Sequence, residues 1–294
     1  MHKSLQNILE LNLAIIFIST SGALGRYIDL PVPMIIAMRA LIAGIVIFFY
    51  CKWQAYEFKI HKADLWKILL SGLFMGLHWL TYFYALKLSN VAIGMLSLFT
   101  YPIITSILEP IILRTRFQKI HLVLGLLVIP GIYFLIPNFD FNNDYSKALA
   151  LGIISAIFYS LRNIITKTKV NEYNGSILMF YQLIIISIIF TPFNFIIDTD
   201  ITAQIPEIIL LALLTTAIGH TWFINSFKNF TVTSASIISS IQPVYGIIIG
   251  IVFLREYPET KTIIGGLFII TTVIMESVIT YKRSIQTVDF KKIK

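Results

Sequence analysis

Residues 99–114 read FTYPIITSILEPIILR, and residues 240–255 read SIQPVYGIIIGIVFLR. A shift of 141 residues superimposes the two stretches, so that Pro102 falls on Pro243 and Arg114 on Arg255. With the same shift Gly125 falls on Gly266, and one insertion or deletion brings His78 beside His220. Similarity at a fixed period indicates a chain made of two related units.

The composition around these stretches is that of a membrane protein. Hydrophobic residues make up 57% of the 294 residues, charged residues 13%, and the mean hydropathy is +0.81. Soluble domains carry about 25% charged residues. The sequence therefore predicts an all-α integral membrane protein and excludes a soluble enzyme. The single cysteine, Cys51, excludes an intrachain disulfide and a cysteine-based metal cluster.

Ten apolar stretches reach the length of about 20 residues that a membrane-spanning helix needs. The first, which begins after Lys3, is expected to be a retained helix and not a cleaved signal peptide, because nine more apolar stretches follow it. We predict spans at 9–26, 31–51, 65–86, 91–113, 119–136, 147–166, 175–197, 205–227, 231–253 and 260–281.

The positive charges indicate the orientation of these spans. With a cytoplasmic N-terminus, seventeen Lys and Arg residues fall on the inner side and five on the outer side, and Arg39 lies inside the second span. Lys and Arg concentrate in cytoplasmic loops, so both termini are expected in the cytoplasm. The net charge of +8 is thus explained by orientation, and no nucleic-acid partner is expected.

Five spans in each unit is an odd number, so the two units should cross the membrane in opposite senses. We therefore expect two inverted five-helix repeats, residues 1–140 and 141–294, around a central cavity. The second repeat ends in a short basic cytoplasmic tail that can meet anionic lipid. Inverted repeats typically enclose a transport site near the middle of the membrane.

The chain resembles the EamA family of the drug/metabolite transporter superfamily over essentially its whole length. The resemblance rests on Arg39 within Ala37–Leu41, on the prolines of the fourth and ninth spans, on Leu254-Arg255-Glu256 and on Gly265-Gly266. The first half departs from the pattern, because Thr115 stands where the family often has Glu. The resemblance implies a carrier of amino acids, related metabolites or drugs, more often an exporter, in a bacterial cytoplasmic membrane.

Charged and titratable residues inside the spans are functional candidates, because lipid makes them costly. We expect Arg39 to face the cavity and meet an anionic group, although a structural or snorkelling role is open. His78 and His220 form a near-symmetric pair that can carry protons or satisfy neighbouring helices. Two carboxylates, Glu109 and Glu276, are further candidates for proton coupling unless water at the inner interface reaches them.

Arg162 lies near the inner end of the sixth span, where the charge pattern favours a role as a positive-inside anchor over one as an inner gate. Aromatic and amide side chains in the middle of the spans predict the cavity wall, since binding sites combine apolar surface with a few polar groups. This predicted lining consists of Trp79, Tyr82, Tyr101, Tyr159, Gln182, Trp222, Gln242 and Tyr245, beside Arg39 and the two histidines.

Pro102 and Pro243 interrupt main-chain hydrogen bonding at matched positions, so we predict a hinge in each half. The pairs Gly72 and Gly76, and Gly246 and Gly250, predict close helix packing.

The sequence thus predicts a secondary transporter, acting on a small organic metabolite by alternating access, with proton coupling left open. The alternatives are a lipid or metabolite flippase, a facilitator, and an intramembrane enzyme that uses His78 or His220 as a base. The last is disfavoured because no Gly-x-Ser-x-Gly elbow and no paired-aspartate motif accompany the histidines. We expect no metal site and no cofactor, and a monomer or homodimer.

Overall fold

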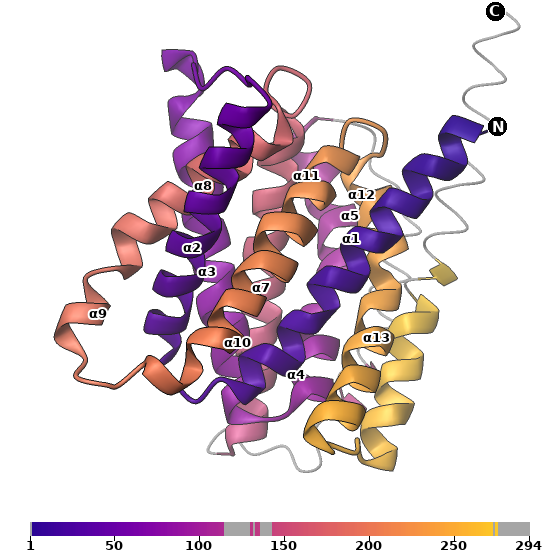
Figure 1. Ribbon diagram of the computed structural model, residues 1–294. Coiled ribbons are helices and arrows are strands. Elements are labelled where there is room, and N and C mark those ends of the chain that lie inside the picture. Colours follow the sequence, from indigo (N-terminus) through magenta and orange to yellow (C-terminus); the bar gives the residue numbers. More distant parts are fainter. Residues whose placement is uncertain (1, 115–129, 132, 136–142, 273, 276–294) are drawn as a thin grey trace, which may run out of the picture.

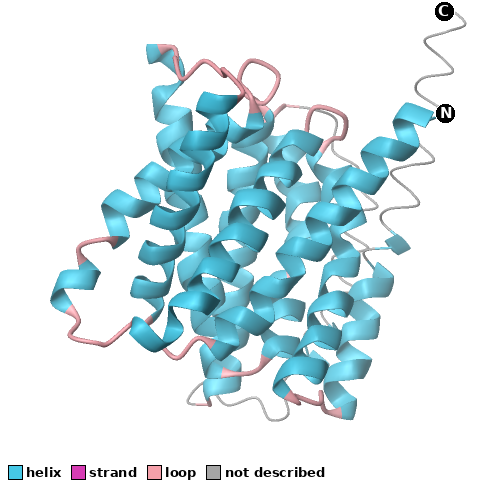
Figure 2. Ribbon diagram, viewed as in Figure 1, coloured by secondary structure: helices cyan, strands magenta, loops and turns pink. Residues whose placement is uncertain are grey.

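The computed structural model describes residues 2–114, 130–131, 133–135, 143–272 and 274–275, and within them the chain forms a bundle of helices (Figures 1 and 2). The first half contributes α1 (His2–Tyr27), α2 (Val32–Trp53), the short η1 (Lys62–Asp64), α3 (Leu65–Leu88), α4 (Val91–Leu98) and α5 (Tyr101–Ile112). The second half contributes α7 (Asp144–Lys167), α8 (Gly175–Phe190), α9 (Phe193–Ile196), η2 (Thr202–Gln204), α10 (Ile205–Leu210), η3 (Leu211–His220), α11 (Thr221–Ser226), α12 (Val232–Ile238), η4 (Ser239–Ile241), α13 (Gln242–Ile249) and η5 (Gly250–Leu254).

Among the described residues, eight helical stretches are long and apolar enough to cross a membrane, and each coincides with one of the predicted spans. The predicted fifth span, 119–136, falls almost entirely outside the described residues. A shorter apolar helix, Thr260–Thr272, covers the described part of the predicted tenth span. The all-helical membrane architecture is therefore confirmed, whereas the count of ten spans and the inverted repeat remain predictions.

Side chains at the helix starts explain why these helices begin where they do. Asn90, Asn143 and Asn174 each accept a hydrogen bond from a backbone N–H in the first turn of α4, α7 and α8, at 2.9, 3.0 and 2.9 Å. Such capping satisfies donors that the helix itself leaves unpaired. In α2 a proline occupies the first turn, Pro33, where no backbone donor is lost.

The prolines of the repeat do not lie in the middle of an unbroken helix, as the sequence suggested. α4 ends at Leu98, and α5 begins at Tyr101, so Pro102 occupies the first turn of a new helix. Pro243 lies equally in the first turn of α13, after the single 3-10 turn η4. The physical reason is that proline fits the first turn of a helix, where its missing N–H costs nothing.

Two segments of the second half are π-helical, namely η3 (Leu211–His220) and η5 (Gly250–Leu254). A π-helix is wound more widely than an α-helix and occurs frequently at functional sites. η3 carries His220, one of the two candidate histidines, at its last position.

Helices of the two halves are interleaved, so the core of the bundle belongs to both. α3 packs against α7 and α8, α2 packs against α8 and η3, and α1 packs against η3 and α13. At one end of the α3–α7 pair, Lys169 forms an ion pair with Asp64, with 2.6 Å between Nζ and Oδ1. Desolvation by burial lowers the pKa of Lys169, but its hydrogen bonds with Asp64 and Glu172 outweigh this effect and raise the pKa above its ordinary value.

Glycines permit the closest of these helix contacts, as predicted for both glycine pairs. A Cβ on Gly72 would lie 2.6 Å from Ile185 Cδ1, so α3 and α8 approach each other at that point. Gly246 and Gly250 face Met95 and Val91 in the same way, and they bring α13 and the start of η5 against α4. Small residues at such contacts are typical of helix packing in membranes.

We expect Gly152→Val to destabilise the protein by about 1–3 kcal/mol, because overpacking forces neighbouring groups to move. A Cβ at Gly152 would lie 1.9 Å from Ser97 Oγ and 2.5 Å from Ser97 Cβ, at the contact between α7 and α4. Thermal unfolding in detergent measures the effect. Gly44→Ala is the matched control, because its added Cβ would meet nothing nearer than 3.8 Å. Equal unfolding temperatures for the two variants would contradict the prediction.

Candidate functional site

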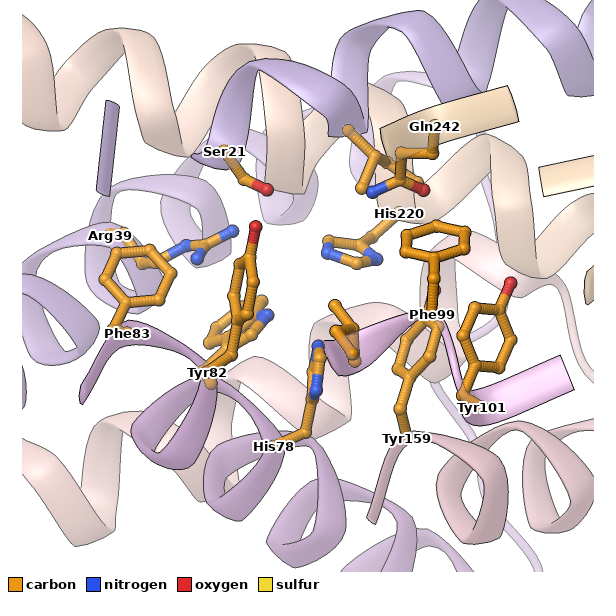
Figure 3. A pocket seen from close by; sticks show the side chains of 13 residues that line it. Ser21, Arg39, His78, Tyr82, Phe83, Phe99, Tyr101, Tyr159, His220 and Gln242 are labelled. Atoms are coloured by element: carbon orange, nitrogen blue, oxygen red, sulfur yellow. The ribbon is translucent and has the colours of Figure 1, made fainter. Parts of the chain in front are cut away.

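A small cavity lies inside the bundle and is lined by α1, α2, α3, α4, α5, α7, η3 and α13 (Figure 3). Its volume is about 10 Å³, which is room for about one water molecule. Eight of the predicted site residues line it, namely Arg39, His78, Trp79, Tyr82, Tyr101, Tyr159, His220 and Gln242. The lining is completed by Ile18, Ser21, Phe83, Leu98 and Phe99.

Arg39 is fully buried and is held in place by the π-helix η3. Its Nε donates to Thr216 Oγ1 at 3.0 Å, and its Nη2 donates to Thr215 Oγ1 and Thr216 Oγ1, each at 2.8 Å. The guanidinium carbon lies 3.8 Å from the centroid of the Trp79 ring, a cation–π contact. The threonines and the indole thus fix one side of the guanidinium.

No carboxylate among the described residues forms an ion pair with Arg39. A buried charge without a counter-ion is costly, and inside a membrane it is a candidate for a functional site. Arg39 thus places a cation without an ion-pair partner among the described residues at the wall of the cavity.

Three buried polar atoms that line the cavity have no hydrogen-bond partner, namely Arg39 Nη1, Tyr82 Oη and His220 Nδ1. Figure 3 shows the Tyr82 hydroxyl directed toward Ser21 and the Arg39 guanidinium, while the Gln242 amide lies beside His220. Buried polar groups are nearly always paired, and each unpaired one requires an explanation. Three such atoms therefore meet at one cavity, which makes its wall the candidate site.

His78 is ordered by a reciprocal contact with α7. Ser155 donates its hydroxyl proton to the His78 carbonyl oxygen at 2.9 Å, so its oxygen accepts from His78 Nδ1, 2.7 Å away. This arrangement assigns the proton of the neutral imidazole to Nδ1. The ring stacks on Tyr159 at 4.5 Å between centroids, and Tyr159 in turn meets Tyr101 edge to face at 4.9 Å.

A second buried arginine, Arg162, lies outside the cavity. Its position differs from the prediction that it anchors the inner end of its helix at the membrane surface. The side chain is fully buried, and it donates to Gln182 Oε1 from Nε and Nη2 at 3.0 and 2.8 Å. Its Nη1 donates to Asn163 Oδ1 at 2.9 Å. These acceptors keep the guanidinium inside the bundle, whereas an anchor would reach the surface.

Several predicted site residues lie elsewhere. Gln182 does not line the cavity, because its side-chain oxygen accepts the hydrogen bonds of Arg162. Its amide nitrogen donates to Ser71 and Thr166. Trp222 is 44% exposed and lines a separate groove between α1 and α11, and Tyr245 is only partly buried. Glu276 lies outside the described residues.

Glu109 lies away from the cavity. Its Oε2 accepts a hydrogen bond from the backbone N–H of Thr233 at 3.1 Å, and another from the Thr233 hydroxyl. Its carboxylate therefore joins the first half to the second.

The sequence reasoning missed Ser21, Phe83, Thr215 and Thr216. The threonines carried a signal, since two adjacent hydroxyls interrupt an apolar run in the eighth span. A threonine in a helix also bonds to its own backbone, as Thr215 does to the Leu211 carbonyl, so its presence alone did not indicate a partner. The described part of the chain contains no group of three or more His, Cys, Asp or Glu side chains that could hold a metal ion.

A site between helices in the interior of the bundle is typical of membrane transporters. The chain belongs to the EamA-like transporter family, whose model matches residues 8–136 and again residues 146–278. It is thus a multi-pass membrane protein of a transporter family.

Two relatives are named as exporters. The pseudopaline exporter CntI of Pseudomonas aeruginosa strain UCBPP-PA14 is 22% identical over 247 residues, which are 83% of this chain and 86% of that protein. The same exporter from strain PAO1 matches equally. An uncharacterized transporter of Clostridium kluyveri is 24% identical over 150 residues, about half of either chain.

A solved structure, described only as a crystal structure of a protein, superimposes with a TM-score of 0.71. The alignment covers 93% of this chain and 98% of the other, at 15% identity. This structural similarity supports the arrangement of helices described above.

Proposed function

We propose that the protein is a secondary transporter that exports a small organic metabolite with an anionic group, such as an amino acid or a related compound, across the cytoplasmic membrane. Alternating access of the two inverted repeats, 1–140 and 141–294, moves the substrate, and both termini lie in the cytoplasm. The unpaired Nη1 of the fully buried Arg39 carries this proposal, since it presents a cation to the cavity, and no described carboxylate is its counter-ion.

The remaining lining supports a substrate with a second polar group. Tyr82 Oη and His220 Nδ1 are unpaired, and Gln242 adds an amide beside His220. The rings of Trp79 and Tyr159 supply apolar surface for the body of the substrate. Few polar groups on an aromatic wall are typical of sites for small molecules.

The size of the cavity supports a transport cycle with a closed state. A volume of about 10 Å³ holds no metabolite, so the walls must separate before a substrate enters. The α-helix is interrupted just before Pro102 and just before Pro243. These interruptions lie beside the cavity residues Tyr101 and Gln242, and they are the proposed hinges. Export is favoured because the relatives that cover most of the chain are named exporters.

A thermal-shift screen of the purified protein against amino acids and related carboxylates is expected to yield stabilising compounds, because a ligand that binds only the folded state stabilises it. Counterflow of any such compound in proteoliposomes then tests transport. A carrier exchanges labelled for unlabelled substrate, whereas a channel-like facilitator shows no counterflow. The absence of stabilisation by every carboxylate, together with stabilisation by neutral compounds, would contradict an anionic substrate.

Proton coupling through His78, His220, Glu109 or Glu276 is a separate part of the proposal. If protons drive export, an imposed pH gradient across the proteoliposome membrane accelerates efflux of the stabilising compound, and its dissipation by an ionophore removes the acceleration. Efflux that does not respond to the gradient would rule out proton coupling and leave the uniport mechanism.

A further inference from the structure

Glu256, which follows η5, joins the two halves at one end of the bundle. Its Oε1 accepts from Arg26 Nε at 3.0 Å, and its Oε2 accepts from the backbone N–H of Val91 at 2.9 Å. Arg26 lies in the last turn of α1, and Val91 begins α4. We name this arrangement of Arg26, Glu256 and Val91 the Glu256 latch.

Glu109 in α5 joins the halves at the opposite end. It accepts from the backbone N–H of Thr233 at 3.1 Å and from the Thr233 hydroxyl. We name the pair Glu109 and Thr233 the Glu109 latch. In Figure 1, α11 and α12 meet at the upper end of the bundle, whereas α1 ends and α4 begins at the lower end.

The 141-residue register of the repeat relates the surroundings of the two latches. Asn90 Oδ1 accepts from Ile93 N at 2.9 Å at the start of α4, and Thr231 Oγ1 accepts from Ser234 N at 3.0 Å at the start of α12. Thr231 follows Asn90 by 141 residues, and Ser234 follows Ile93 by 141. The same kind of cap therefore begins both helices that the latches hold.

A basic side chain stands at equivalent places as well. Arg26 Nη1 donates to the Lys87 carbonyl at 3.4 Å, and Lys167, 141 residues after Arg26, donates to the Phe227 carbonyl and, at 3.0 Å, to the Phe230 carbonyl. In both halves a basic residue in the last turn of the first helix thus binds the segment that precedes the latched helix.

The acids themselves are not equivalent in the repeat. The register places the counterpart of Glu256 at Thr115, which has no carboxylate. Glu109 supplies the carboxylate at the other end from a position six residues earlier in the chain. Two residues at non-equivalent positions thus make matching contacts at the two ends of the bundle. Duplication of one ancestral unit alone does not account for this similarity.

We propose that the Glu256 latch and the Glu109 latch are the two gates of the transport cycle, and that Glu256 and Glu109 are positioning residues that each hold one end of the cavity closed. The inference rests on the proposed alternating-access function. Both latches are formed in this structure, and the cavity has room for about one water molecule. Opening one latch while the other remains formed exposes the cavity to one side only.

Accessibility of a cysteine in the cavity tests the proposal. The chain has one native cysteine, Cys51, which is fully buried and is replaced by alanine in the background. Ser21→Cys then places a thiol in the cavity wall. A membrane-impermeant, negatively charged thiol reagent is applied to right-side-out and to inverted membrane vesicles, and the labelling rate is measured for each variant.

We expect Glu256→Gln to raise the labelling rate about fivefold in one vesicle orientation, and Glu109→Gln to raise it about fivefold in the opposite orientation. Glutamine keeps the shape but loses the charge, and a hydrogen bond to a charged group is roughly twice as strong as a neutral one. Arg26→Gln should act like Glu256→Gln, and Thr233→Val, which removes only the hydroxyl, should act like Glu109→Gln.

Two carboxylates at the same ends provide matched controls. Glu207 lines an apolar groove with Phe253 and Leu254, and Glu172 pairs with Lys169 three residues away. Glu207→Gln and Glu172→Gln are expected to leave the rate unchanged. An increase on the same side for both latch variants, or no change in either while their unfolding temperatures match the parent, would overturn the proposal. Labelling requires no substrate, so this result stands apart from failure to identify one.

Discussion

Replacing Arg39 by glutamine is expected to weaken the binding of carboxylate-bearing ligands by at least about tenfold, since a hydrogen bond to a charged group contributes about 1.5–3 kcal/mol. Nη1 is the one unpaired nitrogen of this guanidinium, so a ligand carboxylate meets both its charge and a free donor there. The Arg39→Lys variant should bind these ligands nearly as weakly. Lysine lacks the planar guanidinium that bonds both threonines while it presents another donor to the ligand.

The measurement is the dissociation constant of any compound that stabilises the purified protein, determined beside that of its neutral ester or amide. The variant should lose affinity for the acid but retain that for the neutral analogue. Arg255→Gln removes an exposed arginine and is expected to change neither the affinity for the acid nor that for the neutral analogue. Equal losses for the acid and the neutral analogue would assign Arg39 a structural role.

Gln182→Leu is expected to destabilise the protein by about 3 kcal/mol, because it removes the oxygen acceptor that two nitrogens of a buried charge share. Gln182 Oε1 accepts both Nε and Nη2 of Arg162, and leucine leaves these donors in an apolar interior. Gln182→Glu keeps an acceptor and adds a counter-charge, so its stability should equal or exceed that of the parent.

Thermal unfolding of the three proteins in one detergent measures this effect. Gln6→Leu is the control, since Gln6 is exposed and its amide bonds only to Glu10 on the same helix. If Gln182→Leu unfolds at the temperature of the control, Arg162 has found other acceptors, and its burial does not depend on Gln182.

Much of the fold was predictable from the sequence because lipid imposes a simple requirement. A span must be apolar, helical and about 20 residues long, so eight of the predicted spans coincide with helices in the described residues. The 141-residue register also has structural counterparts: Pro102 and Pro243 both occupy the first turn of a new helix. The π-helices were not predictable, since they depend on tertiary packing and have no clear sequence pattern.

The sequence predicted the site residues that follow from the free-energy cost of a polar side chain in lipid. It failed for residues whose role depends on the direction in which the side chain points from its helix. Arg39, His78 and His220 were chosen because polar groups in lipid are expensive, and all three line the cavity. Gln182 and Trp222 were chosen on the same ground, but the direction of a side chain around its helix depends on how the helix is rotated. Gln182 points to Arg162, which sequence counting had placed at the membrane surface.

The contact between Trp79 and Arg39 also gives the protein an optical reporter of its own. Trp79 is 1% exposed, whereas Trp53, Trp66 and Trp222 are 80%, 59% and 44% exposed. An indole held 3.8 Å from a cation should change its emission when an anion neutralises that cation. With the three exposed tryptophans replaced by phenylalanine, the intrinsic fluorescence of the remaining one follows occupancy of the cavity without any attached label.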